Sequence, residues 1–157
     1  MHVRVERVDR AVSRCRAERA DGVVVEFLVH NHPGRLPHDL CHFAVESTLG
    51  LADGFWSLLD RGVMFKGVAR AGGTGKGRPA RRLVQRRGDQ LDEIELLVAG
   101  VTGCWENDDR AVTVAGFSHD EVSACHDALD SLDAQWQKVG IGEALSLEWA
   151  LDASNAT

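Results

Sequence analysis

The chain has no tyrosine, only three prolines, and no apolar run that approaches the length of a membrane span. Because a spanning helix needs about 20 consecutive apolar residues, the sequence predicts no transmembrane segment. The missing tyrosine excludes any mechanism that uses a phenol of this chain, and phenylalanine and tryptophan must supply all aromatic packing. The first residues alternate polar and apolar side chains and do not form the apolar block of a signal peptide, so we predict an intracellular, cytoplasmic protein.

Closely spaced cysteine pairs are also missing. The four cysteines, Cys15, Cys41, Cys104 and Cys125, include no Cys-x-x-Cys pair. This spacing argues against a zinc ribbon, an iron–sulfur site and a thioredoxin-type motif. We interpret the cysteines as reduced thiols in or near the core.

The length of 157 residues predicts one domain, residues 1–157. A domain of this size buries roughly two-thirds of its unfolded surface without help from disulfides or a structural metal. The fold therefore needs no structural metal, and a metal that this protein binds can have a functional role.

Charge is unevenly distributed along the chain. The net charge is −6, yet residues 66–88 contain eight lysines and arginines and no acid. Glycine is frequent in the first part of this segment, which disfavours a fixed backbone, so we predict a flexible basic loop at 66–88. Such a loop suggests one possible function, that of a non-catalytic binding module. The loop would then dock an acidic partner or nucleic acid through Arg81, Arg82, Arg86 and Arg87.

The hydrophobic periodicity predicts an α+β fold. Three N-terminal strands form an antiparallel sheet, a C-terminal strand joins it, and about four helices pack against it. The strands are expected at 2–8, 11–18, 23–29 and 144–151. The helices are expected from Pro37 to Leu49, from Phe55 to Arg61 with Asp53 as its cap, after Asp89, and after Ser118, whose spacing to Glu121 is that of a capping box.

Histidine is concentrated in one short stretch. Four of the seven histidines, His30, His32, His38 and His42, lie within thirteen residues. At 100° per residue, His38 and His42 share the apolar, inward face of the predicted helix with Val45 and Leu49. Two histidines at i and i+4 can converge on one divalent ion, as they do in His-Glu-x-x-His zinc enzymes.

We predict from these residues a small metalloprotein that binds a divalent metal ion, and zinc is the first candidate. His38, His42 and Glu46 are the candidate metal ligands, and Asp39 and Glu46 are the candidate catalytic groups. Asp53 or His126 is an alternative third ligand. As an enzyme, the protein would catalyse hydrolysis or a related elimination (lyase) reaction on a small molecule. Metal-free acid/base catalysis by the same histidines and acids is a further alternative.

The stretch Pro37-His38-Asp39-Leu40-Cys41-His42-Phe43-Ala44-Val45-Glu46 resembles a motif of uncharacterised bacterial proteins of similar length. That resemblance implies no known activity. The His-Asp-x-x-His core is also similar to the zinc motif of a ubiquinone-biosynthesis family, which places a glutamate after eleven further residues. This chain has Gly54 at that position, so the resemblance identifies no third ligand.

Overall fold

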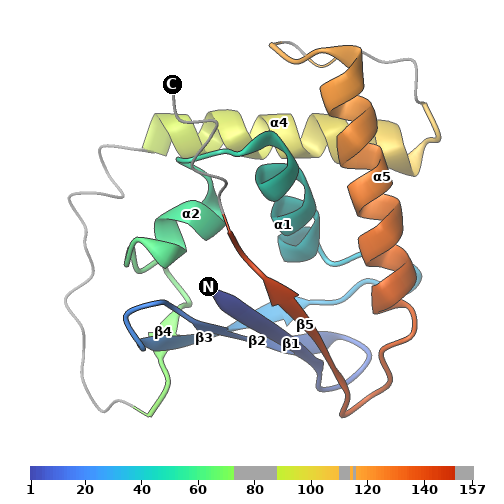
Figure 1. Cartoon of the computed structure of the whole chain (residues 1–157). Helices are drawn as coiled ribbons and strands as arrows, with labels where there is room; N and C mark the ends of the chain where they lie inside the picture. Colours follow the sequence, from blue (N-terminus) through green and yellow to red (C-terminus); the bar gives the residue numbers. More distant parts are fainter. Residues whose placement is uncertain (73–87, 110–113, 115, 151–157) are drawn as a thin grey trace.

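The fold is built on one antiparallel sheet with helices on one of its faces (Figure 1). A computed structural model describes residues 1–72, 88–109, 114 and 116–150, and for residues 88–90 the backbone alone. In this part of the chain, five strands lie in the order β4-β3-β2-β1-β5. The strands are β1 (His2–Arg7), β2 (Val12–Glu18), β3 (Val24–His30), β4 (Ala69–Arg70) and β5 (Ala144–Glu148). The helices are α1 (His38–Leu49), α2 (Phe55–Asp60), α4 (Gly88–Glu106) and α5 (His119–Trp136).

Alternation of side chains fixes which face of the sheet is covered. Successive residues of a strand point to opposite faces, and the register pairs Val5 with Cys15, and Cys15 with Phe27. These three side chains are buried, whereas Arg4 and Arg14, on the other face, are exposed. The four helices of the described residues all lie on the side of the buried strand residues (Figure 1).

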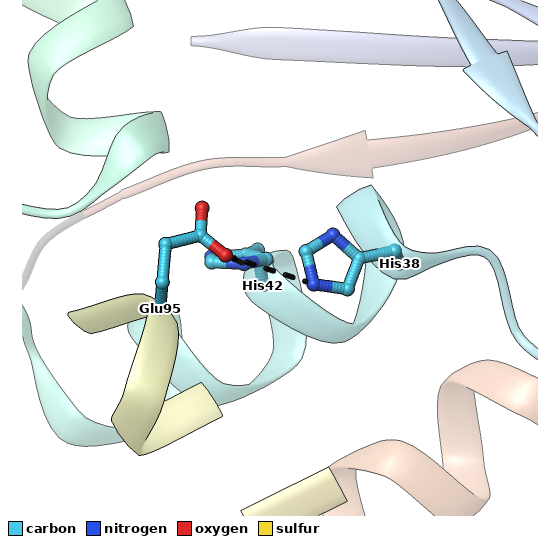
Figure 2. A group of neighbouring side chains, drawn as sticks. All are labelled: His38, His42 and Glu95. Atoms are coloured by element: carbon cyan, nitrogen blue, oxygen red, sulfur yellow. Dashed lines mark hydrogen bonds and ion pairs between the residues drawn. The ribbon is translucent and has the colours of Figure 1, made fainter. Parts of the chain in front are cut away.

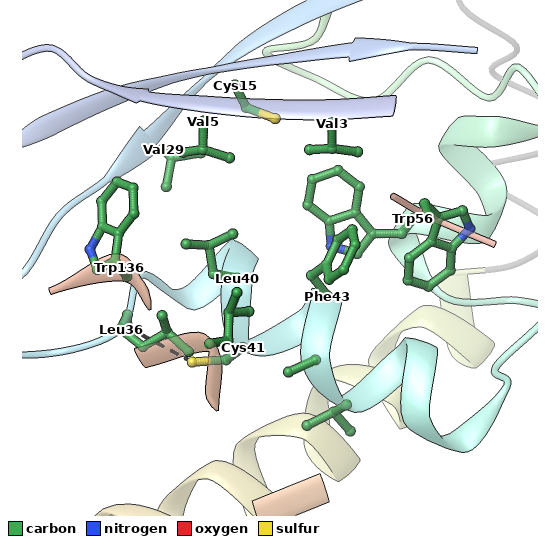
Figure 3. Packing of buried hydrophobic residues seen from close by; sticks show 14 of the residues in the cluster. Val3, Val5, Cys15, Val29, Leu36, Leu40, Cys41, Phe43, Trp56 and Trp136 are labelled. Carbon is green, nitrogen blue, oxygen red and sulfur yellow. Dashed lines mark hydrogen bonds between the residues drawn. The ribbon is translucent and has the colours of Figure 1, made fainter. Parts of the chain in front are cut away.

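Helix α1 lies at the centre of the helical layer. Every residue from Leu40 to Glu46 is buried, and α1 contacts β3, α2, α4 and α5. The middle turns of α1 are thus covered on all sides and belong to the interior of the fold. Figure 3 shows its side chains between the sheet and the other helices, with Leu40 and Phe43 facing strand residues such as Val3 and Val5. The two histidines of the motif therefore belong to a helix that is packed between the sheet and the other described helices.

Phenylalanine and tryptophan supply the aromatic packing, as the lack of tyrosine predicts. The ring of Phe43 meets the rings of Trp56 and Trp149 edge-on, with centroids 5.3 Å apart in both pairs. Phe27 of β3 and Phe55 of α2 extend this cluster, with their own centroids 5.6 Å apart. Edge-to-face pairs are worth about 0.5–1.5 kcal/mol each beyond burial. They hold α2 against α1 and thereby fix the turn between the two helices.

The α+β fold predicted from the sequence is confirmed, with local corrections. Strand β4 was not predicted, because two residues in a glycine-rich segment carry no strand pattern. Pro37 is the N-cap of α1 and not its first helical residue, and α2 is capped by Gly54 and not by Asp53. The capping box of Ser118 and Glu121 is present at the start of α5.

The basic loop falls largely on residues 73–87, and these, with Arg81, Arg82, Arg86 and Arg87, lie outside the described residues. Within the described residues, no helix combines the length and the apolar character that crossing a bilayer requires.

Candidate metal centre

The two motif histidines are neighbours at the start of α1. His38 is the first residue of the helix and His42 follows one turn later, with ring centroids 4.6 Å apart and planes inclined by 69°. The His38 side chain is 62% exposed and the His42 side chain only 4%. The i, i+4 spacing thus forms a pair with one imidazole anchored inside the protein and the other accessible from solvent.

A third side chain comes from α4. One carboxylate oxygen of Glu95, Oε2, lies 3.1 Å from His42 Nε2 and 3.7 Å from His38 Nε2. Figure 2 shows the three side chains converging between α1 and α4. Among the described residues, His38, His42 and Glu95 form a group whose ligand atoms all lie within 4.8 Å of one another, and such a group can hold a metal ion. Helix α4 therefore supplies an acid that the sequence analysis did not select.

A signal for Glu95 was present in the sequence but incomplete. Glu95 lies four residues after Leu91 and three before Val98, so it borders the inward-facing apolar stripe of α4. The stripe predicts that Glu95 points towards a neighbouring element. It does not say which one, because the docking of α4 on α1 is a tertiary contact.

Glu46 occupies a different place from the one predicted for a metal ligand. Its Oε1 accepts a hydrogen bond from His42 Nδ1 at 2.9 Å and another from the backbone N–H of Phe55 at 3.0 Å. Its Oε2 accepts from the backbone N–H of Trp56, also at 3.0 Å. The carboxylate is completely buried and covers the first backbone N–H groups of α2. It therefore contacts the ring nitrogen of His42 that faces away from Glu95.

The contacts of His42 determine how its ring nitrogens are used. Because the Glu46 carboxylate accepts from Nδ1, Nε2 is the nitrogen directed to Glu95 and His38. Burial lowers the pKa of His42, but the hydrogen bonds to Glu46 and Glu95 outweigh burial and raise this pKa to about 9. The hydrogen bond from His42 lowers the pKa of Glu95 below its usual range. Two carboxylates thus stabilise positive charge at His42.

Gly54 lies so close to Glu46 that no larger residue fits there. A Cβ atom built on Gly54 would be 2.3 Å from Glu46 Oε2 and 2.4 Å from its Cδ. Both are far inside van der Waals contact, and the carboxylate has no room to move because it is buried and held by three donors. The glycine is required for this approach and not for backbone freedom, since its φ is −73°.

We expect Gly54→Ala to lower the free energy of unfolding by about 1–3 kcal/mol, the usual cost of overpacking. Urea unfolding followed by circular dichroism measures this difference. Gly100→Ala on α4 is the matched control, because a Cβ there meets nothing within 4 Å. A Gly54 variant as stable as the wild type would show that the contact between Gly54 and Glu46 is not as close as described.

The predicted catalytic residue Asp39 lies beside the metal group but outside it. Its backbone carbonyl accepts a hydrogen bond from Trp56 Nε1 at 3.1 Å. Burial raises the pKa of its carboxyl group, while the charges of His38 and His42 act in the opposite direction. Asp39 is thus within electrostatic reach of both histidines. This position is compatible with a role in orienting the histidines or in accepting a proton.

Neither alternative third ligand joins the group. Asp53 accepts a hydrogen bond from Arg61 Nη2 at 3.1 Å, at the outer end of the α1–α2 turn. His126 on α5 is buried, and neither of its ring nitrogens has a hydrogen-bond partner among the described residues. Among these residues, Glu95 alone completes the histidine pair.

Comparisons of the chain with protein-family models, with curated proteins and with solved structures found no match. The function is therefore inferred from the residues of the chain itself.

Proposed function

We propose that this protein binds one divalent metal ion, zinc, through His38 Nε2, His42 Nε2 and a carboxylate oxygen of Glu95, and uses it for hydrolysis or a related elimination on a small molecule. The observation that carries the proposal is the convergence of these three ligand atoms from two helices within 4.8 Å. This is the metal-dependent function predicted from the sequence, with Glu95 as the third ligand in place of Glu46.

The geometry supports metal binding with little rearrangement. In a tetrahedral zinc site with Zn–N distances of 2.0–2.1 Å, neighbouring ligand atoms are about 3.4 Å apart. The contacts of Glu95 with His42 and His38, 3.1 and 3.7 Å, bracket that value. His38 and Glu95 are both more than half exposed, so their side chains can make the remaining adjustment without disturbing the core.

Glu46 supports the same proposal from behind His42. Histidine ligands of metals almost always donate their other ring N–H to a carboxylate or carbonyl, which fixes the tautomer and orients the ring. The hydrogen bond from His42 Nδ1 to the buried Glu46 is such a contact. In this proposal Glu46 is a positioning residue, and a divalent cation takes the place of the proton on His42 Nε2.

The ligand set favours a catalytic over a structural site. Two histidines and one glutamate leave a coordination position open, whereas structural zinc sites are closed by four protein ligands. The exposure of His38 and Glu95 leaves that position accessible to a small molecule. A divalent ion held here would supply Lewis-acid polarisation of a substrate oxygen, and Asp39 is the nearby carboxyl group that could take up a proton. The same two-histidine, one-carboxylate set also binds ferrous iron, which is the alternative metal.

A hydrolysis assay with chelation tests the catalytic part of this proposal. We expect the untagged protein to hydrolyse members of a panel of small esters, amides and phosphoesters, to lose this activity after treatment with a chelator, and to regain it with one equivalent of zinc. Restoration by ferrous iron and not by zinc would assign the alternative metal. Activity that survives complete removal of metal would contradict the proposal and favour metal-free acid/base catalysis.

A further inference from the structure

A cavity that shares no lining residue with the metal group is bordered by arginines. It encloses about 260 Å³ where three segments meet: the end of β1 with the β1–β2 turn, residues 31–35 between β3 and α1, and the C-terminal end of α5. In Figure 1 these segments come together below the last turn of α5. Among the described residues, its lining includes Arg7, Arg10, Arg35 and His32 but no carboxylate side chain. This is unusual in a chain whose net charge is −6.

Arg7 is fixed in place as a wall of this cavity. Its guanidinium lies over the ring of Trp136, 4.4 Å from the ring centroid, and its Nη2 donates to the Trp136 carbonyl at 3.1 Å. Its Nε is buried and has no hydrogen-bond partner among the described residues. A buried charged donor without a partner is costly unless an acceptor reaches it. The orientation of Arg7 is thus determined by Trp136.

The acids around the cavity already have partners, and the Asp133 carboxylate accepts a hydrogen bond from the side chain of the lining residue Gln137 at 2.8 Å. The Asp9 carboxylate accepts the backbone N–H groups of Ala11 and Val12, at 2.7 and 2.8 Å. Glu106 lies 3.4 Å from Arg35 Nη1 in an exposed ion pair, a type of contact that contributes little. Glu106 therefore pairs with Arg35 from outside the lining, while the lining residues themselves include arginines and no acid.

We propose that this cavity binds a small organic anion, whose carboxylate or phosphate group lies among Arg7, Arg10 and Arg35 and whose apolar part lies against Pro33 and Ile141. Guanidinium groups bind carboxylate and phosphate through paired N–H donors, which suits either anion. Ile141 is 62% exposed at the rim and offers an apolar contact that a bare inorganic ion does not use. The volume is below the roughly 300–1,000 Å³ of pockets for drug-sized ligands, so the ligand is small.

The cavity is distinct from the metal centre but close to it along the chain. Residues 31–35 are followed by the buried residues Leu36 and Pro37 and then by His38, the first residue of α1. The binding of an anion by this segment goes beyond the proposed function and does not require the metal.

Nuclear magnetic resonance titration with phenyl phosphate, benzoate and inorganic phosphate tests this proposal. We expect phenyl phosphate or benzoate to shift the amide signals of Asn31, His32, Gly34, Arg35 and Gln137, and to bind more tightly than inorganic phosphate. Arg10→Gln should weaken that binding about 10-fold or more, as loss of a charge-assisted hydrogen bond does. Arg14→Gln on the uncovered face of the sheet is the matched control and should leave the affinity unchanged.

The variants are chosen so that the fold is retained. Arg10 is exposed and makes no hydrogen bond or ion pair within the described part of the chain, whereas replacing Arg7 would remove the contact with Trp136. Phosphate that binds as tightly as phenyl phosphate would contradict the apolar part of the proposal. Shifts confined to other regions, or equal affinities for the Arg10 and Arg14 variants, would overturn it entirely.

Discussion

We expect Glu46→Ala to lower the free energy of unfolding by about 3–5 kcal/mol, the range for removing one partner from a buried ion pair. The substitution leaves His42 Nδ1 and the backbone N–H groups of Phe55 and Trp56 without their acceptor. Each unsatisfied buried donor adds a desolvation cost, and the lost side-chain atoms leave a cavity. Because domains are stable by only about 5–15 kcal/mol in total, this is a large fraction of the stability.

Urea unfolding of the metal-free protein, followed by tryptophan fluorescence, measures this effect. Glu95→Ala is the matched control, because Glu95 contacts the same imidazole at 3.1 Å but is 53% exposed. We expect the control to cost no more than about 1 kcal/mol, as exposed ion pairs do. Equal stabilities of the Glu46 and Glu95 variants would show that Glu46 does not organise the contact between α1 and α2.

We expect His38→Ala and Glu95→Gln each to weaken zinc binding at least about 100-fold. Changes in residues that only orient the ligands already cost 10- to 100-fold, and the loss of a direct ligand costs more. Both side chains are exposed, so the fold of the metal-free protein should change by no more than about 0.5 kcal/mol. His42 is less suitable for this experiment, because its removal also leaves Glu46 buried without a partner.

Competition titration with a chromophoric zinc chelator gives the affinities. His30→Ala is the control, since His30 belongs to the same histidine-rich stretch but lies exposed at the end of β3, outside the metal group. We expect this variant to bind zinc as the wild type does. If it lost affinity while the His38 and Glu95 variants kept theirs, the metal would be bound elsewhere in the stretch.

Short-range patterns were sufficient to predict much of the fold. The strands follow from alternation, as in β2, where Ser13, Cys15 and Ala17 are buried and their neighbours are not. Helix α1 follows from Pro37 before it and Gly50 after it, and Gly50 adopts the left-handed conformation that ends the helix. The pairing of His38 with His42 needs only the helical repeat, which is why the sequence reveals it.

The remaining part of the site depends on contacts between elements far apart in the sequence. Glu95 reaches His42 across 53 residues, through the docking of α4 on α1. The partners of Glu46 at Phe55 and Trp56 become visible only when the turn after Gly50 brings α2 back towards α1. The helical repeat placed Glu46 next to His42, but on the sequence alone it was assigned as a ligand. Its hydrogen bonds support a role in orienting His42.

Elemental mass spectrometry of the untagged protein, beside a His38→Ala/Glu95→Gln double variant, tests the central claim most directly. The account predicts close to one equivalent of zinc, or of iron if the alternative metal is bound, in the wild type after brief exposure to both ions and desalting. It predicts little or none in the double variant, with circular dichroism spectra that are the same for both proteins. The absence of metal from both proteins, or equal metal in both, would contradict a metal centre formed by His38, His42 and Glu95.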